Sequence, residues 1–113
     1  MILADLEAHL QQIGLSTGEL TANGQSFLVI KGVPINSGSH EGQVCEVALL
    51  RSNNNPWIPE AKLHVRPHMV PMGQRSSFTS PLGADWQYLS RRFDASPTPR
   101  SYYSHILTVL GEL

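Results

Sequence analysis

The spacing of apolar residues predicts a helix at each end of the chain. Near the N-terminus, apolar side chains recur every three or four residues on one face, and Gly14 follows as a stop signal. This face contains Ile2, Leu3, Leu6, Leu10 and Ile13. Near the C-terminus, Thr98 is a suitable N-cap and Pro99 suits the first helical position. The face predicted for the second helix contains Tyr103, Ile106, Leu107, Leu110 and Leu113.

Between these helices, the pattern predicts an antiparallel meander. Residues 27–30 and 44–50 are apolar and rich in β-branched side chains, which favours strands. Within the second of these, alternation separates Cys45, Val47 and Leu49 from Val44, Glu46 and Ala48. The Asn23-Gly24 pair predicts a tight turn, so residues 15–22 could form a further strand.

A third predicted strand, residues 61–66, has one apolar and one polar face. Leu63 and Val65 are expected to face the core. The face expected to be in water carries Lys62, His64 and Arg66.

The pattern then loses its period. Residues 67–86 form an irregular segment of about 20 residues, a length typical of functional loops or disorder. Residues 87–93 are interpreted as a short helical piece. The whole chain, 1–113, is therefore expected to be one α+β domain. Its predicted order is an N-terminal helix, three to four strands, a long irregular crossing and a C-terminal helix, with both helices covering one face of the sheet.

The composition of the chain argues against nucleic-acid binding and against insertion in a membrane. The net charge is −1, and two lysines and six arginines are too few and too scattered for a nucleic-acid groove. No apolar run approaches the roughly 20 residues of a membrane span, and the N-terminus lacks the features of a signal peptide. One cysteine cannot form an internal disulfide, so a reducing, cytoplasmic location is expected.

The candidate chemical groups are sparse. Cys45 lies in an apolar strand and is interpreted as a structural cysteine rather than a nucleophile. His64 and His68 are separated by Pro67 and cannot form a helical metal pair. No metal site and no cofactor are expected. The serines near residues 76–90 each fit a turn or a cap as well as a nucleophile.

The order of these parts resembles the ubiquitin-conjugating (UBC-like) fold. More specifically, it resembles a bacterial branch of that superfamily, encoded beside ubiquitin-like and activating-enzyme-like proteins. The matching pieces are FLVIKGVPI, VALLRSNNNPWIPEAKLHVRP and GADWQYLSRRF, followed by the closing helix that ends LTVLGEL. Trp86-Gln87 and Ser90-Arg91-Arg92 stand where that branch has a Trp-Gln pair and a Ser-Arg-His or similar triplet. The resemblance covers about residues 2 to 113.

The chain also departs from that family. Conjugating enzymes place their catalytic cysteine in the crossing after the last strand, but residues 67–100 contain no cysteine. The His-Pro-Asn signature of that family is missing, and Pro67-His68-Met69 resembles it only weakly.

The resemblance implies two sets of site residues. The first is catalytic, with Ser90 as an oxyester-forming nucleophile and His68 and Asp85 near it. The second binds the partners, an activating-enzyme-like protein and a ubiquitin-like protein, and consists of Trp57, Trp86, Arg91 and Arg92. The two arginines could equally form a solvated pair with nearby aspartates.

Three hypotheses follow. The chain is a variant carrier of the modifier that lacks the usual cysteine, or a catalytically inactive UBC-like adaptor. Alternatively, it is an unrelated α+β domain with a structural or assembly role, because a resemblance of fold alone does not establish a function.

Overall fold

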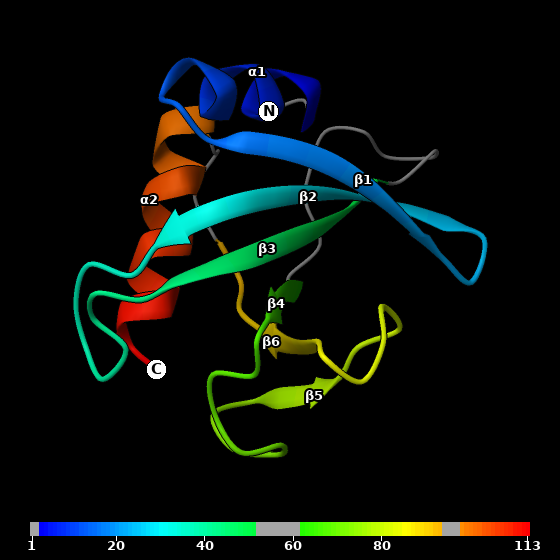
Figure 1. Ribbon diagram of the computed structural model, residues 1–113, viewed down its shortest axis with the longest axis vertical. Coiled ribbons are helices and arrows are strands. Elements are labelled where there is room, and N and C mark those ends of the chain that lie inside the picture. The colour runs from blue at the N-terminus through cyan, green and yellow to red at the C-terminus, as the bar shows by residue number, and fades with distance from the viewer. Residues whose placement is uncertain (1–2, 52–61, 94–97) are drawn as a thin grey trace.

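A computed structural model describes residues 3–51, 62–93 and 98–113 (Figure 1). Within them, the elements are α1 (Leu3–Gln12), β1 (Ser16–Ala22), β2 (Gln25–Pro34), β3 (Val44–Arg51), β4 (Lys62–Arg66), β5 (Ser77–Thr79), β6 (Gln87–Ser90) and α2 (Pro99–Gly111). The strands pair antiparallel in one six-stranded sheet, in the order β1-β2-β3-β4-β6-β5. The predicted α+β class is confirmed, but the sheet has more strands than the three to four predicted.

The first hairpin forms where the sequence predicts it. Ala22 pairs with Gln25, so only Asn23 and Gly24 lie in the turn. Both have positive φ angles, 52° and 74°, as a type I′ turn requires. The predicted strand at residues 15–22 is therefore present as β1.

One face of the sheet packs against both helices. Alternate side chains of β2, β3, β4 and β6 meet the apolar faces of α1 and α2 in the main core. In β2, a register shift between Ile30 and Val33 marks a bulge. Because of that extra residue, Ile30 and Val33 both reach this core although they are three positions apart.

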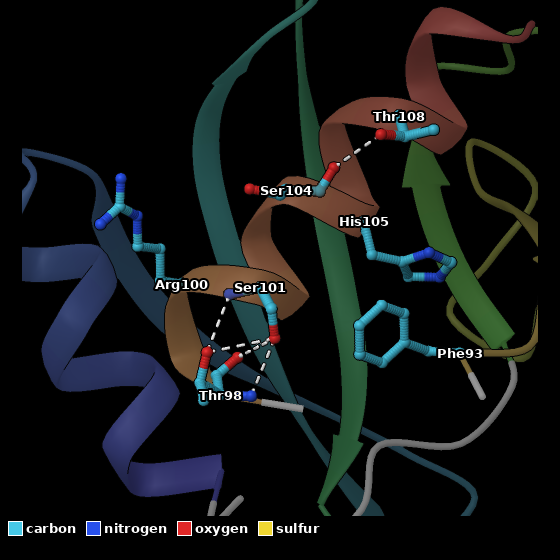
Figure 2. A pocket seen from close by; sticks show the side chains of 7 residues that line it. All are labelled: Phe93, Thr98, Arg100, Ser101, Ser104, His105 and Thr108. Atoms are coloured by element: carbon cyan, nitrogen blue, oxygen red, sulfur yellow. Dashed lines mark hydrogen bonds between the residues drawn. The ribbon is translucent and has the colours of Figure 1, made fainter. Parts of the chain in front are cut away.

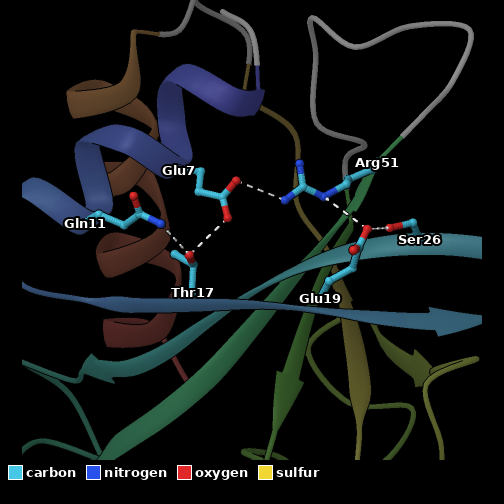
Figure 3. A network of polar contacts seen from close by, with 6 residues as sticks. All are labelled: Glu7, Gln11, Thr17, Glu19, Ser26 and Arg51. Carbon is cyan, nitrogen blue, oxygen red and sulfur yellow. Dashed lines mark hydrogen bonds and ion pairs between the residues drawn. The ribbon is translucent and has the colours of Figure 1, made fainter.

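A polar network ties α1 to the first three strands (Figure 3). Glu7 of α1 accepts hydrogen bonds from Thr17 Oγ1 at 3.0 Å and from Arg51 Nη2 at 3.1 Å. Arg51 Nε lies 3.8 Å from Glu19 Oε1, and Glu19 also accepts a hydrogen bond from Ser26. All these groups lie where α1 crosses the sheet, so the network fixes the placement of the helix.

The helical faces differ from the prediction at five positions. Ile13 lies beyond the end of α1 and is 48% exposed, so it is not part of the core. In α2, Tyr102 and Val109 are buried, whereas Tyr103 and Leu107 are only partly buried against the core. The N-terminus of α2 is as predicted, because Thr98 and Ser101 form a capping box and Pro99 starts the helix.

The segment after β4 is also more regular than predicted. β5 lies within the segment 67–86 that was expected to be irregular. Residues 87–90 form the strand β6, so the helical interpretation of 87–93 is wrong. The Arg66–Pro67 peptide bond that opens this segment is cis.

The loop between β2 and β3 packs closely on the C-terminal end of α2. Gly38 has a φ of +82°, and a Cβ atom built on it would lie 2.1 Å from the carbonyl oxygen of Gly111. A Cβ built on Gly111 would in turn lie 2.3 Å from Ser37 Oγ. Position 38 therefore requires glycine, whereas a Cβ at position 111 would require the Ser37 hydroxyl to rotate away.

Candidate functional site

The stretch 86–90 distributes its side chains between the two faces of the sheet. Gln87 and Leu89 are fully buried, and Leu89 belongs to the main core. Trp86 and Tyr88 lie on the opposite, helix-free face because side chains alternate along a strand. Ser90 shares this parity and is exposed at the end of β6. The helix-free face is therefore where the predicted site residues of this strand can meet a partner.

Gln87 is a buried polar residue whose amide oxygen and amide nitrogen both have hydrogen-bond partners. Its Oε1 atom accepts hydrogen bonds from the backbone N–H groups of Met69 and Val70, at 2.6 Å and 3.2 Å. Its Nε2 atom donates to the Val70 carbonyl oxygen at 3.0 Å. Gln87 thus holds the segment after β4 against β6, a structural task rather than a chemical one.

The predicted catalytic residues do not come together. His68 Nε2 lies 2.9 Å from the Trp86 carbonyl oxygen, at the start of β6. Ser90 is four residues further along this extended strand, a separation of roughly 13 Å. Asp85 is exposed and precedes Trp86, so it too lies at the end away from Ser90. The residue directly opposite Ser90 is Lys62 of β4.

The predicted partner-binding residues differ in exposure. Trp86 is only 3% exposed and packs with Phe27, Val29 and Ala48, so its ring is not presented at the surface. The Arg66 guanidinium also covers it, 4.9 Å from the ring centroid. Arg92 is exposed, and Arg91 is half-exposed with Nη1 donating to the Ser90 carbonyl oxygen at 2.9 Å. Trp57 lies outside the described residues.

Cys45 is a buried core residue, as predicted. Its side chain is 3% exposed and belongs to the main core with Val47 and Leu49. Burial raises the pKa of the thiol to about 12, and the Glu46 carboxylate acts in the same direction. At neutral pH the group is a protonated thiol, which is a poor nucleophile.

His64 is not in water, contrary to the prediction. It is 2% exposed, because the rings of Phe27 and Tyr88 lie beside it with centroids 5.1 Å and 5.6 Å away. Burial lowers the pKa of His64 to about 4, and the positive charge of Lys62 contributes in the same direction. The imidazole is therefore neutral at physiological pH.

Ser80 is the hydrogen-bond partner of that imidazole. Ser80 Oγ lies 2.9 Å from His64 Nδ1, and it also accepts a hydrogen bond from the Leu82 N–H at 3.1 Å. The contact joins Nδ1 to a hydroxyl that can either donate or accept, so either neutral tautomer of His64 is compatible with it. A Ser–His pair of this kind is a possible catalytic element, but Ser80 itself is 4% exposed.

A small pocket of about 140 Å³ opens on the helix-free face beside His64. Its apolar walls are Phe27, Leu50 and Pro81. Its polar groups come from Gln25, Lys62, His64 and Tyr88. The Lys62 ammonium is held over the Tyr88 ring, 5.1 Å from the centroid.

A second, larger hollow of about 540 Å³ runs along α2 (Figure 2). His105 and Phe93 form one side of it, with ring centroids 4.9 Å apart. Burial lowers the pKa of His105, against the opposing influence of Glu112, and Arg91 lowers it further. The histidine and the aromatic ring thus form a packed pair rather than an isolated imidazole.

The hydroxyl groups along this hollow serve the helix itself. Thr98 and Ser101 bond to each other in the capping box, and Thr108 Oγ1 donates to the Ser104 carbonyl oxygen at 2.9 Å. Ser104 and His105 are neighbours in sequence, and side chains one position apart on a helix do not face each other. This arrangement supports packing, and it does not assemble a nucleophile with a base.

The sequence did not predict that His64 is buried, or that Tyr88 and Ser80 contact it. The one sequence feature that pointed to this cluster was the aromatic residue at position 88, between Gln87 and Leu89. Nothing in the local sequence places Phe27 or Ser80 against His64, because these contacts join residues far apart in the chain.

Among the described residues there is neither a helix that could span a membrane nor a cluster of side chains that could hold a metal ion. The helices of the described residues contain 10 and 13 residues, and neither is long enough to cross a membrane. In the same residues, no group of three or more His, Cys, Asp or Glu side chains is placed to hold a metal ion. No family model, no curated protein and no solved structure matches the chain.

Proposed function

We propose that this chain is a catalytically inactive UBC-like adaptor that binds a ubiquitin-like protein through the helix-free face of its sheet. The observation that carries this proposal is a row of partly exposed apolar side chains across that face. From one edge of the sheet to the other, the row contains Leu20, Leu50, Tyr88 and Phe78.

The row has the character of a protein-binding surface. Leu20 and Phe78, at its two ends, are 38% and 45% exposed. Tyr88 stacks on Phe78 with ring centroids 5.1 Å apart, which presents two aromatic rings together. Apolar and aromatic side chains surrounded by polar groups are typical of interfaces. Six strands spaced by about 4.8 Å give the row a length of roughly 24 Å, so it extends across the whole sheet.

The chemistry of the described residues favours binding over catalysis. The Cys45 thiol is buried and protonated. Ser90 is exposed, but His68 and Asp85 lie at the other end of the strand, so neither can take its proton. An activated nucleophile requires a base within hydrogen-bond reach.

One observation supports the carrier as a second candidate. Ser90 is exposed directly opposite Lys62, and an ammonium group there could stabilise negative charge developing during acyl transfer. In that reaction, Ser90 Oγ attacks the thioester carbonyl of the modifier on its activating enzyme. An oxyester forms, the C–S bond breaks, and the serine proton passes to the departing thiolate.

The test uses a ubiquitin-like protein and an activating-enzyme-like protein of the bacterial branch that the chain resembles, with ATP. Titration calorimetry measures binding of the ubiquitin-like protein, and intact-mass spectrometry detects any covalent adduct. For the adaptor, we expect binding without an adduct, and Phe78→Ser should weaken that binding about tenfold. Ile13→Ser is the matched control, because Ile13 is similarly exposed at 48% but lies after α1.

Other outcomes discriminate between the candidates. An adduct that resists dithiothreitol, yields to hydroxylamine and disappears in Ser90→Ala identifies the carrier. If the chain binds the activating-enzyme-like protein but not the ubiquitin-like protein, it is an adaptor for the activating-enzyme-like protein. Absence of both binding and adduct contradicts both candidates and leaves the structural role.

A further inference from the structure

The pocket beside His64 contains two polar groups, of Lys62 and Tyr88, with no hydrogen-bond or ion-pair partner among the described residues. Within the described residues, Lys62 Nζ contacts the Tyr88 ring and has no carboxylate within ion-pair distance. The Tyr88 hydroxyl likewise has no hydrogen-bond partner there. None of the described residues that line the pocket is acidic, and the full charge among them is the positive charge of Lys62.

Aromatic and imidazole rings form part of the pocket wall. Phe27 and the imidazole of His64 meet edge to face at 77°, and Tyr88 closes another side. A cavity of about 150 Å³ lined by apolar groups is known to hold one benzene ring. The volume here, about 140 Å³, therefore suits a ligand of one small ring or a short aliphatic chain.

The charge of the pocket selects the polar part of that ligand. One ammonium group balances a single negative charge, whereas a phosphate dianion would require more cations or an arginine fork. A carboxylate has two oxygens, which can accept from Lys62 and from the Tyr88 hydroxyl at the same time. The Gln25 amide offers a further donor at the same pocket.

We propose that this pocket binds a monocarboxylate with a small planar or apolar tail, with Lys62 as its charge partner and Tyr88 as a hydrogen-bond donor. The carboxylate belongs either to a free organic acid or to the C-terminal residue of a polypeptide. The inference does not rest on the adaptor function, because a small acid tests it with no partner protein present.

The experiment is a titration of the full chain with benzoate, followed by two-dimensional NMR of the backbone amides. We expect saturable shifts at Gln25, His64 and Tyr88, with far smaller shifts in α1. Lys62→Met should weaken binding about tenfold, and Tyr88→Phe should weaken it severalfold. Lys31→Met is the control, because Lys31 is an exposed lysine of β2 that does not line the pocket, and it should leave the affinity unchanged.

Neutral benzamide separates charge recognition from apolar filling. If benzamide binds as tightly as benzoate, or if Lys62→Met binds benzoate normally, the proposal is overturned. The absence of saturable shifts also overturns it. A pair of peptides with the same sequence, one ending in a free carboxylate and one in an amide, then identifies the source. Tighter binding of the acid peptide than of benzoate indicates a chain terminus, and benzoate binding alone indicates a free acid.

Discussion

His64 Nδ1 lies 2.9 Å from Ser80 Oγ in the interior of the helix-free face, although 16 residues separate the two in sequence. The pair joins β4 to the loop that leads from β5 into β6. It also keeps a neutral imidazole at a position where an alternating strand would otherwise be expected to place a solvated side chain.

We expect Ser80→Ala to destabilise the fold by about 1–3 kcal/mol, because His64 Nδ1 would remain buried without its partner. The Leu82 N–H would lose its acceptor as well. Urea denaturation followed by circular dichroism measures the change. Ser104→Ala is the control, since Ser104 is exposed in α2 and its replacement should change stability by less than about 0.5 kcal/mol. Equal effects of the two variants would contradict the assigned role of Ser80.

The buried imidazole of His64 should make stability depend on pH. Its pKa is lowered from 6.5 to about 4 in the folded chain, so between these values the unfolded chain binds more protons. The contribution of the neutral His64 to the free energy of unfolding is therefore fully present above about pH 6.5. The free energy of unfolding falls by up to about 3 kcal/mol as the pH decreases toward 4.

Denaturation at a series of pH values measures this slope. His64→Leu should flatten it, whatever its effect on absolute stability, because the titrating group is gone. His105, whose pKa is also lowered by burial, should account for part of the slope that remains. A slope that His64→Leu leaves unchanged would show that His64 is already solvated in the folded state.

Gly38 and Gly42 form a matched pair for testing the loop that packs on α2. Both have positive φ angles, +82° and +89°, but only Gly38 has an atom close to its missing Cβ. We expect Gly42→Ala to cost about 1 kcal/mol from backbone strain alone. Gly38→Ala should cost about 3 kcal/mol or more, since its Cβ would also displace the Gly111 carbonyl. Thermal denaturation of both variants measures the difference, and similar costs would mean that the contact with Gly111 is not rigid.

The Cys45 thiol should react only when the chain unfolds. Its burial and its raised pKa, about 12, both suppress the thiolate, so we expect little labelling by Ellman's reagent in native buffer and complete labelling in urea. Ser90→Cys in a Cys45→Ala background provides the exposed control and should react at once. Rapid native labelling of Cys45 would contradict its place in the core.

The sequence predicted those elements in which apolar residues occupy the buried positions and polar or small residues the others. Cys45, Val47 and Leu49 alternate with polar or small residues, and β3 has the predicted orientation. Asn23-Gly24 and Thr98-Pro99 carry local conformational signals, so the hairpin and the start of α2 were also predictable.

The errors fall where a polar side chain is buried by distant partners. Gln87 occupies a core position because Met69 and Val70 satisfy its amide, and this polar residue hides the alternation of β6. His64 is buried because Phe27 and Tyr88 cover it. For the same reason, the pocket beside His64 could not be predicted. Ser90, His68 and Asp85 were grouped through the resemblance to the UBC-like family, and the extended strand β6 holds Ser90 apart from the other two.

The two-residue turn at Asn23-Gly24 decides what each side of β1 touches. Its length sets the pairing of Leu20 with Phe27 and of Glu19 with Leu28. A slip of one residue would exchange the two sides of the strand, because side chains alternate with a period of two. Glu19 would then leave Arg51, and Leu20 would turn from the open face toward α1. This two-residue turn thus determines which side of the first strand anchors a helix and which side remains open to a partner.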